Sequence, residues 1–447
     1  MPTDRPASRP FSRRNALKAL TLPCLAGLGT AGCGASGQTV QVAVIWTGWE
    51  LRQFKRVMDK FSDIHHIGYQ LLSMGDDTGA FLNNEVTAAA QPDVMLVSAP
   101  GLVNSNSKRL APVPWHSYYA PSWKNFLPGG DIQYGVWFKA AYQSMVWHAA
   151  RDPDVPDGGW DWDTWVEQCR KLAKAGRAPL SVGAADGWVL AAWFANVLLS
   201  INPRIYKTLA TEYARDRYSG NGPTWSHPSV REALCRLAEV WRIEGAFPGG
   251  AERALVTQFD QSVLDVFASR RAAMVVGADY FWPIITQSTQ FPQKNVRWFQ
   301  FPSRSGEHIP AVVGGDAAVL FRRPGSDAPG KTLIDWLGTR EAARIWAGAG
   351  GYLSINEQVT GDYYHYPPEM NIEKLISYVQ HRSPGGGSAA FNFDMADLLG
   401  GPLSGGDGEG TWKIFTDFFT EVAVRRSSVS DAINRAVIAL DTGSSGA

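Results

Sequence analysis

The chain has 447 residues, of which 45% are hydrophobic and 19% are charged, so its length corresponds to two or three domains with a large core. Its 42 Lys and Arg balance 42 Asp and Glu, which excludes the basic surface of most nucleic-acid-binding proteins. The 45 Gly and 27 Pro are too few for a low-complexity chain, while the surplus of 18 Trp favours flat apolar binding surfaces.

The first 32 residues have the pattern of an export signal. They carry five Lys and Arg against one Asp, and the apolar stretch 19–32 is too short to span a membrane. Residues 12–18 resemble the twin-arginine export motif, and residues 30–33 resemble a lipobox that is cleaved before a lipid-carrying Cys. We therefore expect a mature chain, 33–447, of net charge about −4, anchored through Cys33 at the outer face of the cytoplasmic membrane. A disordered basic tail is the alternative interpretation.

Strands and helices are predicted in alternation from residue 40 onwards. An apolar, β-branched run at 40–46 predicts a strand, and apolar residues at i, i+3, i+4 and i+7 over 50–64 predict an amphipathic helix. A second buried strand is expected at 94–97. Strand, helix and strand in this order favour a parallel sheet covered by helices, and hence an α/β fold.

The remainder of the chain continues this alternation. Extended chain is expected at 134–147, further strands at 272–276 and 317–321, and helices at 162–175, 230–244 and 331–347. The Gly-rich stretch 383–411 is too long for a simple connector, so it is either a functional loop or a disordered insert. Its centre, 391–394, favours the functional loop.

Motifs for covalent or metal chemistry are absent from the sequence. It contains no nucleophile elbow, no zinc-binding His helix and no C-x-x-C pair, so no cofactor or metal is expected. Residues 325–332 fit the phosphate-loop pattern, but Asp327 brings negative charge and Pro329 removes a backbone donor. Cys169 and Cys235 both lie in predicted helices, either as free thiols or as a disulfide.

A series of motifs in chain order resembles one protein family. The series includes Trp46-Thr47-Gly48-Trp49-Glu50 after the first strand, Trp162-Asp163-Thr164-Trp165 at a helix start, Gly314-Gly315-Asp316, and Phe393-Asp394-Met395-Ala396-Asp397-Leu398. Their order is similar to that in the extracellular solute-binding proteins of carbohydrate ABC importers, the group of maltose-binding protein. The resemblance spans nearly the whole mature chain. It departs at residues 137–139 and 148–149, so it does not imply a particular sugar.

The resemblance implies two α/β lobes that close on a ligand between them. Crossing segments are expected near residues 142, 302 and 355, which assigns 33–141 and 303–354 to lobe 1 and 142–302 and 355–447 to lobe 2. The implied function is that of a lipid-anchored, monomeric receptor that captures a small carbohydrate and delivers it to membrane permease subunits. It has no catalytic residues.

The expected ligand site combines aromatic rings with acceptor groups, because sugars present apolar C–H faces and many hydroxyls. By resemblance and position at strand ends or loops, the ligand-binding residues are Trp46, Trp49, Glu50, Trp188, Tyr280, Trp282, Gly315, Asp316, Asp394 and Trp412. By contrast, Trp residues inside periodic segments are expected in the core, namely Trp147, Trp165, Trp193, Trp241, Trp336 and Trp346.

Two other functions remain open on the sequence alone. The pairs Asp161/Asp163 and Asp394/Asp397 are candidate carboxylate pairs for a secreted glycoside hydrolase. A helix cap for the first pair and sugar-hydroxyl acceptors for the second are the simpler explanations. A structural or adhesive lipoprotein is the third possibility.

Overall fold

The computed structural model describes residues 38–74, 82, 91–129, 132–150, 153–214, 224–322, 328–380, 392–400, 403 and 410–445. Residues 38–447 cluster as one compact unit. The predicted export signal and Cys33 lie outside the described residues. Among the helices that are described, none has both the length and the apolar character needed to cross a bilayer.

The first sheet contains six of the described strands. Their order is β12 (Asn392–Phe393), β11 (Val312–Leu320), β3 (Val94–Val97), β1 (Thr39–Val44) and β2 (Gly68–Ser73), with β6 (Val136–Tyr142) on the other side of β11. The strands β1, β2 and β3 are parallel, whereas β11 runs antiparallel to β3 and β6. The predicted strands at 40–46 and 94–97 and the α/β class are thus confirmed.

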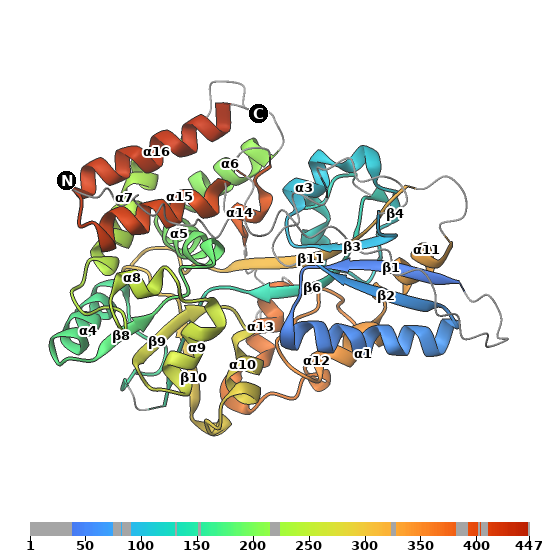
Figure 1. Ribbon diagram of the computed structural model, residues 1–447, viewed down its shortest axis with the longest axis horizontal. Coiled ribbons are helices and arrows are strands. Elements are labelled where there is room, and N and C mark those ends of the chain that lie inside the picture. Colours follow the sequence, from blue (N-terminus) through green and yellow to red (C-terminus); the bar gives the residue numbers. More distant parts are fainter. Residues whose placement is uncertain are drawn as a thin grey trace, which may run out of the picture. The chain divides into compact units, whose positions relative to one another are not determined.

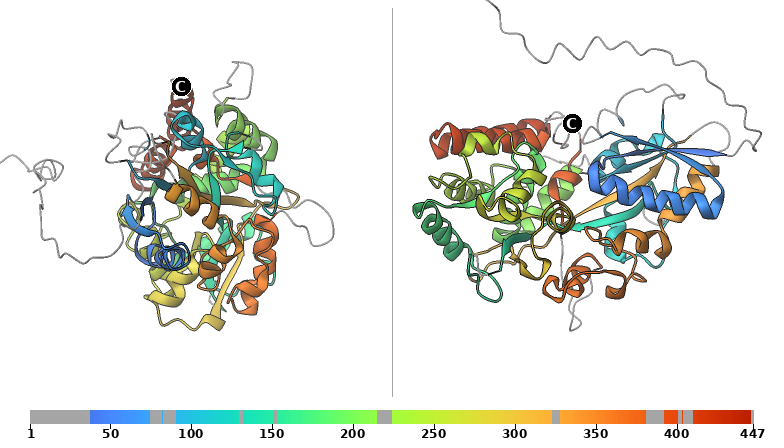
Figure 2. Two further views of the ribbon diagram at one scale, coloured as in Figure 1. Left: turned by 90° about the vertical axis from the view of Figure 1, so that its right-hand side faces the viewer. Right: turned by 60° about the horizontal axis from the view of Figure 1, so that its bottom comes forward.

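Helix α1 (Gly48–His65) packs next to this sheet through an apolar face. Its apolar positions fall on one face, so Phe54, Val57, Met58 and Phe61 are all buried, and burying each such side chain contributes about 1.5–3 kcal/mol. The helix ends at His66, which adopts a left-handed conformation with φ 56°. Figures 1 and 2 show α1 alongside β1 and β2.

The predicted helix 331–347 is two helices, α11 (Ala328–Leu337) and α12 (Arg340–Ala347). The break occurs because the Thr339 side chain accepts a hydrogen bond from the N–H of Ala342 and starts a new helix. Gly338 at the break lies so close to His116 that a Cβ there would be 2.4 Å from its Nε2. The periodicity of the apolar residues did not reveal this interruption.

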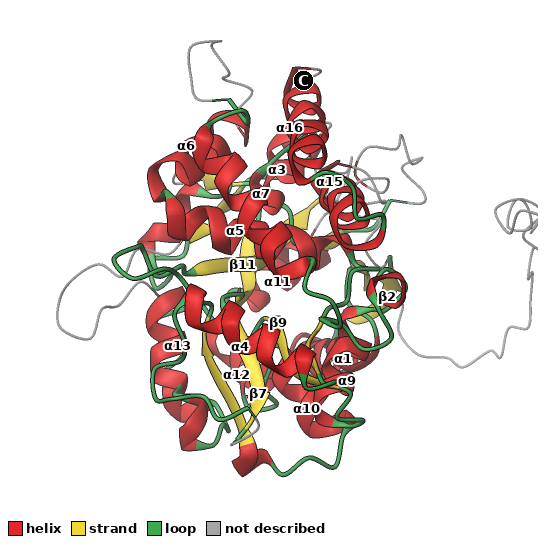
Figure 3. Cartoon of the chain, turned by 90° about the vertical axis from the view of Figure 1, so that its left-hand side faces the viewer, coloured by secondary structure: helices red, strands yellow, loops and turns green. Residues whose placement is uncertain are grey.

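The second sheet is formed by β10 (Val296–Gln300), β7 (Met145–Ala149), β9 (Ala272–Gly277) and β8 (Ala178–Ser181). Helices pack on it and on one another (Figure 3), namely α4 (Trp162–Lys174), α5 (Gly187–Ile201), α7 (Pro228–Trp241), α9 (Phe259–Phe267), α10 (Phe281–Ser288), α15 (Gly410–Phe419) and α16 (Val429–Ser445). The six Trp residues expected in the core are all buried, at 7% exposure or less.

Shorter elements connect these layers. The helices are α3 (Pro100–Ser105), α6 (Pro203–Ala214), α8 (Ala251–Ala254), α13 (Ile372–Val379), α14 (Met395–Leu398) and a π-helical turn, Thr420–Val424. The small strands β4 (Val113–Pro114) and β5 (Ile132–Gln133) pair with each other. Single 3-10 turns occupy Ser107–Arg109, Pro121–Asn125, Gln293–Asn295, Gly361–Tyr363 and Pro368–Met370. Cys169 and Cys235 are free thiols.

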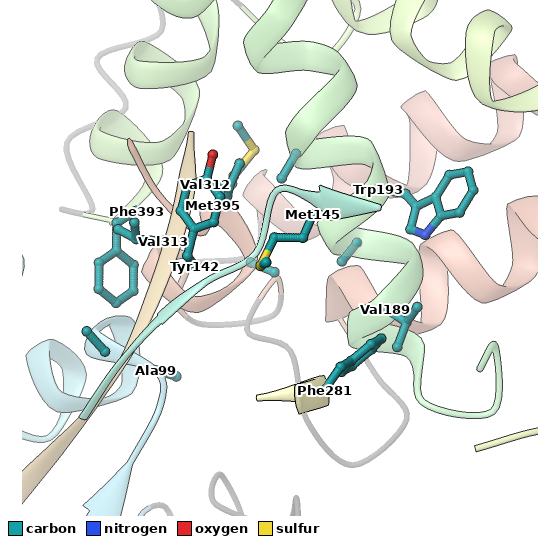
Figure 4. Close-up of a cluster of buried hydrophobic side chains, with 14 of the residues drawn as sticks. Ala99, Tyr142, Met145, Val189, Trp193, Phe281, Val312, Val313, Phe393 and Met395 are labelled. Carbon is teal, nitrogen blue, oxygen red and sulfur yellow. The ribbon is translucent and has the colours of Figure 1, made fainter. Parts of the chain in front are cut away.

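The chain passes between the two sheets at residues 143–144 and again between Gln300 and Val312 (Figure 1). Ser144 joins the two passages, because its Oγ accepts a hydrogen bond from the N–H of Val312 (2.9 Å) and its carbonyl accepts one from the N–H of Phe301 (2.9 Å). Figure 4 shows the buried cluster around this junction, with Tyr142 and Met145 on either side of it.

The third crossing, which is expected near residue 355, stays a prediction, and contacts made by later residues bear on its position. Residues that follow 355 still contact the first sheet region: the indole of Trp123 donates a hydrogen bond to the carbonyl of Val379, and Tyr378 stacks on Tyr142 at 4.5 Å. The strand β12 then pairs with β11. We therefore propose that residues 355–380 and the strand β12 belong to lobe 1 and that the third crossing follows β12.

Candidate functional site

A cavity of ≈ 590 Å³ lies between elements of the two sheets. One wall comes from the loop after β1, from Lys139 on β6 and from Gly314, Gly315 and Asp316 on β11. The opposite wall comes from the N-terminal ends of α5, α9 and α10 and from Trp412 on α15. The first wall uses the carboxyl end of a parallel strand, where α/β folds place their ligands.

Nearly all of the predicted site residues meet at this cavity. It is lined by Trp46, Trp49, Glu50, Trp188, Tyr280, Gly315, Asp316, Asp394 and Trp412. Trp282 is the exception, since it is 4% exposed and packs against Tyr366 and Gly350. It lies in the first turn of α10, whereas Tyr280 is the N-cap residue of that helix and faces the cavity.

Three aromatic rings form a continuous apolar surface on the α5–α9–α10 wall. The ring centroids of Trp188 and Phe259 are 5.3 Å apart, and Tyr280 lies 6.1 Å from Trp188 and 6.2 Å from Phe259. The opposite wall carries Trp46, which is 3% exposed and packs against the rings of Phe54 and Trp346. Aromatic faces on both walls suit a ligand with two apolar faces.

Trp412 is positioned by close packing between α15 and α5. A Cβ on Gly187, the first residue of α5, would lie 2.8 Å from both the Cβ and the carbonyl oxygen of Trp412. Glycine at 187 therefore allows α15 to approach and to place the indole at the cavity. The Nε1 atoms of Trp412 and Trp49 are buried and have no acceptor within the described structure.

A buried ion pair sits in the first wall. The ammonium of Lys139 bonds to the carboxylate of Glu50 and lies 4.0 Å from the carboxylate of Asp316. It also lies 5.0 Å from the ring of Tyr280 and 5.8 Å from that of Trp46, within the range of cation–π attraction. Lys139 thus contacts groups from both walls.

Burial controls the pKa values of the charged groups here. Burial alone would lower the pKa of Lys139, but the neighbouring carboxylates, Glu50 foremost, outweigh it and raise that pKa. Burial raises the pKa of Asp316 to about 7, and Lys139 acts in the opposite direction. Asp279, a fully buried residue next to Tyr280, also has its pKa raised by burial to about 7, although its Oδ1 accepts a hydrogen bond from the N–H of Tyr142.

Asp394 and Asp397 add two further carboxyl groups to the cavity, beside those of Glu50 and Asp316. Asp394 caps α14, since its Oδ1 accepts from the N–H of Ala396 at 2.9 Å, and burial raises its pKa to about 6. Burial and the carboxyls of Asp394 and Asp316 raise the pKa of Asp397 well above its usual range. The other candidate pair lies elsewhere: Asp161 caps α4, and Asp163 pairs with Arg304 on the surface.

Several lining residues were not among the predicted ligand-binding residues. They are Lys139, Gln143, Asp186, Phe259 and Asp397, together with polar residues at the rim. Every residue of β6 is buried, so no alternation distinguishes Lys139 from its neighbours. Lys139 could have been recognised by its charge, because a Lys within an apolar run needs a buried partner of opposite charge.

Comparisons with known proteins found two similar binding proteins and a shared fold. No protein-family model matches the chain. The osmoprotective compounds-binding protein GgtB of Synechocystis sp. is 24% identical over 408 residues, which cover 85% of this chain and 88% of that protein. The alpha-glucosides-binding periplasmic protein AglE of Rhizobium meliloti is 23% identical over 410 residues, covering 86% and 83%.

A solved structure, maltose-bound MalE3 of T. maritima, superposes with a TM-score of 0.66 at 15% identity over 91% of this chain and 100% of that chain. At this identity the likeness shows the fold. The sequence relatives and the shared fold together confirm the resemblance inferred from the order of motifs: the chain is similar in sequence to periplasmic binding proteins and has the two-lobe α/β architecture of solute-binding proteins.

Proposed function

We propose that this protein is a receptor that captures a carbohydrate in the cavity between its lobes and delivers it to an ABC import permease, without chemistry of its own. The observation that carries the proposal is the cavity itself, which presents aromatic rings on both walls and carboxylates between them. Rings stack on the C–H faces of a sugar, and carboxylates accept hydrogen bonds from its hydroxyls. The two relatives are named as binding proteins for osmoprotective compounds and for alpha-glucosides, which supports this chemical class.

The ligand-binding residues in this proposal are the nine predicted residues at the cavity. Trp46, Trp188, Tyr280 and Trp412 provide apolar contact, and Trp49 adds an unpaired indole N–H. Glu50, Asp316 and Asp394 orient the hydroxyls, while Gly315 lets β11 lie close to Trp123, whose ring a Cβ at this position would meet at 2.7 Å. Trp282 is not part of this set, because it packs against Tyr366 and Gly350 and does not line the cavity.

Calorimetry of the purified protein against a panel of sugars and polyols tests the proposal. We expect at least one α-glucoside or polyol to bind with micromolar affinity and to be recovered unchanged. Trp412→Ala should weaken that binding roughly tenfold or more while the protein stays folded. Trp336→Ala, a matched Trp that is buried away from the cavity, should instead lower the free energy of unfolding by about 3–5 kcal/mol.

The same experiment separates the alternatives. The paired carboxyls Asp394 and Asp397 at the cavity are the one feature that favours a glycoside hydrolase. Product formation from any disaccharide, lost in Asp394→Asn, would establish that function in place of the receptor. A complete absence of binding would favour an adhesive or structural role.

The lipid anchor is a separate part of the proposal. It rests on the lipobox-like residues 30–33 and the twin-arginine-like residues 12–18. Replacement of Cys33 by Ser should move the protein from the membrane fraction to the soluble extracytoplasmic fraction. Retention in the membrane fraction would refute the anchor at Cys33.

A further inference from the structure

Three aromatic rings lie close to the ammonium of Lys139 at the cavity. Its Nζ atom is 5.0 Å from the ring centroid of Tyr280, 5.2 Å from that of Trp346 and 5.8 Å from that of Trp46. A cation within about 6 Å of such a centroid is attracted by the ring, so all three rings are in range. We call the rings of Trp46, Tyr280 and Trp346 the aromatic cage.

The aromatic cage is assembled from three separate parts of the chain. Trp46 lies in the loop after β1, Trp346 lies in α12, and Tyr280 is the N-cap residue of α10. Trp46 and Trp346 are 3% and 0% exposed, and their centroids are 4.9 Å apart, so packing fixes both rings. Tyr280 comes from the opposite wall of the cavity. The cage therefore includes rings from both walls.

Two carboxylates complete the aromatic cage as a site for a cation. Glu50 forms an ion pair with Lys139, and the carboxylate of Asp316 lies 4.0 Å from the same ammonium. The two acidic side chains are only 24% and 13% exposed, so water screens their charges poorly. Aromatic rings arranged around a cation are the means by which proteins recognise organic ammonium ions. Here the ammonium in the cage belongs to the chain itself.

The occupied cage adjoins the space available to a ligand. Lys139, Glu50, Asp316, Trp46 and Tyr280 all line the cavity. Burial would lower the pKa of Lys139, but the neighbouring carboxylates, Glu50 foremost, outweigh it and raise that pKa, so the side chain stays charged at neutral pH. A ligand ammonium would have to displace this side chain or lie beside an equal charge.

We propose that Lys139 is a specificity-determining residue: its ammonium occupies the aromatic cage that would otherwise take an organic cation, and so reserves the cavity for neutral polyhydroxyl ligands. This inference rests on the proposed function, whose ligand class it narrows. A neutral sugar does not compete for the cage and leaves the ion pair of Lys139 with Glu50 in place.

Two variants at the same position test the inference. Lys139→Ala deletes the side chain beyond Cβ, a fragment equivalent to propylammonium, and empties the cage. Lys139→Met removes the same charge but keeps the space filled with an apolar side chain. Both are titrated by calorimetry at about pH 7, where an alkylamine keeps its proton. The probes are propylammonium chloride and 1-propanol, its uncharged counterpart.

We expect Lys139→Ala to bind propylammonium roughly tenfold or more tightly than 1-propanol, because only the cation is attracted by the rings and the carboxylates. Wild type and Lys139→Met should bind neither probe. Equal binding of propylammonium by both variants would reduce the effect to net charge and overturn the role of the cage. A folded Lys139→Ala without preference for the cation would overturn it as well.

Circular dichroism establishes that each variant is folded. If Lys139→Ala does not fold, Lys139→Val with ethylammonium takes its place, because a β-branched residue suits strand β6 and deletes one carbon fewer. Arg52→Met is the control for charge at the cavity rim, since Arg52 lines the cavity but is exposed. It should gain no binding of propylammonium, and a gain equal to that of Lys139→Ala would contradict the inference.

Wild type supplies an arm that needs no variant. It should bind a neutral sugar of the panel and bind neither propylammonium nor choline. If it binds a sugar and also binds either cation, the inference is wrong and the receptor function stands. If no sugar binds while Lys139→Ala takes up propylammonium, the receptor function is overturned, and with it the role of Lys139 in specificity.

Discussion

Lys139 and Glu50 place opposite charges in a cavity wall where either charge alone would be costly. The side chain of Lys139 is 4% exposed and that of Glu50 is 24% exposed, so water compensates little for the loss of a partner. Lys139→Met would leave Glu50 and Asp316 without their cation. We expect it to lower the free energy of unfolding by about 3–5 kcal/mol and to weaken sugar binding.

The control is the exposed pair Lys55–Asp59, whose side chains are 58% and 50% exposed. Lys55→Met should change the unfolding free energy by no more than about 1 kcal/mol. Denaturant titration of both variants measures the two effects. Equal losses would show that the Lys139 pair is not a buried structural contact.

Asp279 links stability to pH. Its pKa rises from 3.8 to about 7 on folding because the side chain is buried. A carboxyl with a raised pKa stabilises the fold fully at a pH below its unfolded pKa, and this contribution is lost as the pH rises through the folded pKa. Asp279→Asn retains an acceptor for the N–H of Tyr142 but cannot ionise.

We therefore expect the stability of Asp279→Asn relative to wild type to increase by about 3 kcal/mol between about pH 5 and about pH 8, which corresponds to roughly two pKa units. Urea denaturation at several pH values measures this difference. A difference that stays constant, or that decreases with pH, would contradict a raised pKa for Asp279.

Some of the residues at the cavity could be predicted from the sequence. Trp46, Glu50 and Asp316 were found because each lies at a recognisable motif next to a strand. Tyr280 and Trp282 are two positions apart on either side of Phe281, where α10 starts, and only Tyr280 lines the cavity. A shift of one or two residues in a helix start, which sequence patterns do not resolve, decides such assignments.

At the scale of elements, the contact between α5 and α15 determines where Trp412 lies. Gly187→Ala would place a methyl group 2.8 Å from the carbonyl oxygen of Trp412, so the two helices must separate. We expect this variant to weaken sugar binding roughly tenfold and to lower the free energy of unfolding by about 1–3 kcal/mol. Calorimetry and denaturant titration measure the two effects.

Gly348→Ala is the matched control. Gly348 is the C-cap of α12 with φ −64°, and a Cβ there would meet His365 at an ordinary 3.4 Å. Gly348→Ala should leave both sugar binding and the free energy of unfolding nearly unchanged. If Gly187→Ala behaves like Gly348→Ala, the α5–α15 contact does not position the Trp412 side chain.

Individual elements were more predictable than their connections. Helices α1 and α4 and strands β1, β3 and β9 follow from local apolar patterns and caps, within one or two residues. The position of the third crossing depends on contacts such as that of Trp123 with Val379, which are 256 residues apart. Local patterns contain no information about such pairs.

For the whole molecule, the two passages joined at Ser144 are the natural place for a hinge. The first passage has only two residues, and both passages share the hydrogen bonds of Ser144, so a change in their backbone angles would move the two walls of the cavity together. We expect a bound sugar to reduce the radius of gyration measured by small-angle scattering. Asp394→Ala at the same sugar concentration should show a smaller reduction, and an unchanged radius in wild type at saturation would contradict closure.

The most direct test of the receptor proposal is a titration of the protein with sugars in which binding and turnover are followed in the same sample. Calorimetry should give saturable, micromolar binding of a carbohydrate, and chromatography of the mixture should return that carbohydrate intact. Trp188→Ala, which removes one ring of the aromatic wall, should weaken the binding without unfolding the protein. Cleavage of the sugar, or binding that is unaffected by changes to the cavity walls, would contradict a sugar receptor that acts through this cavity.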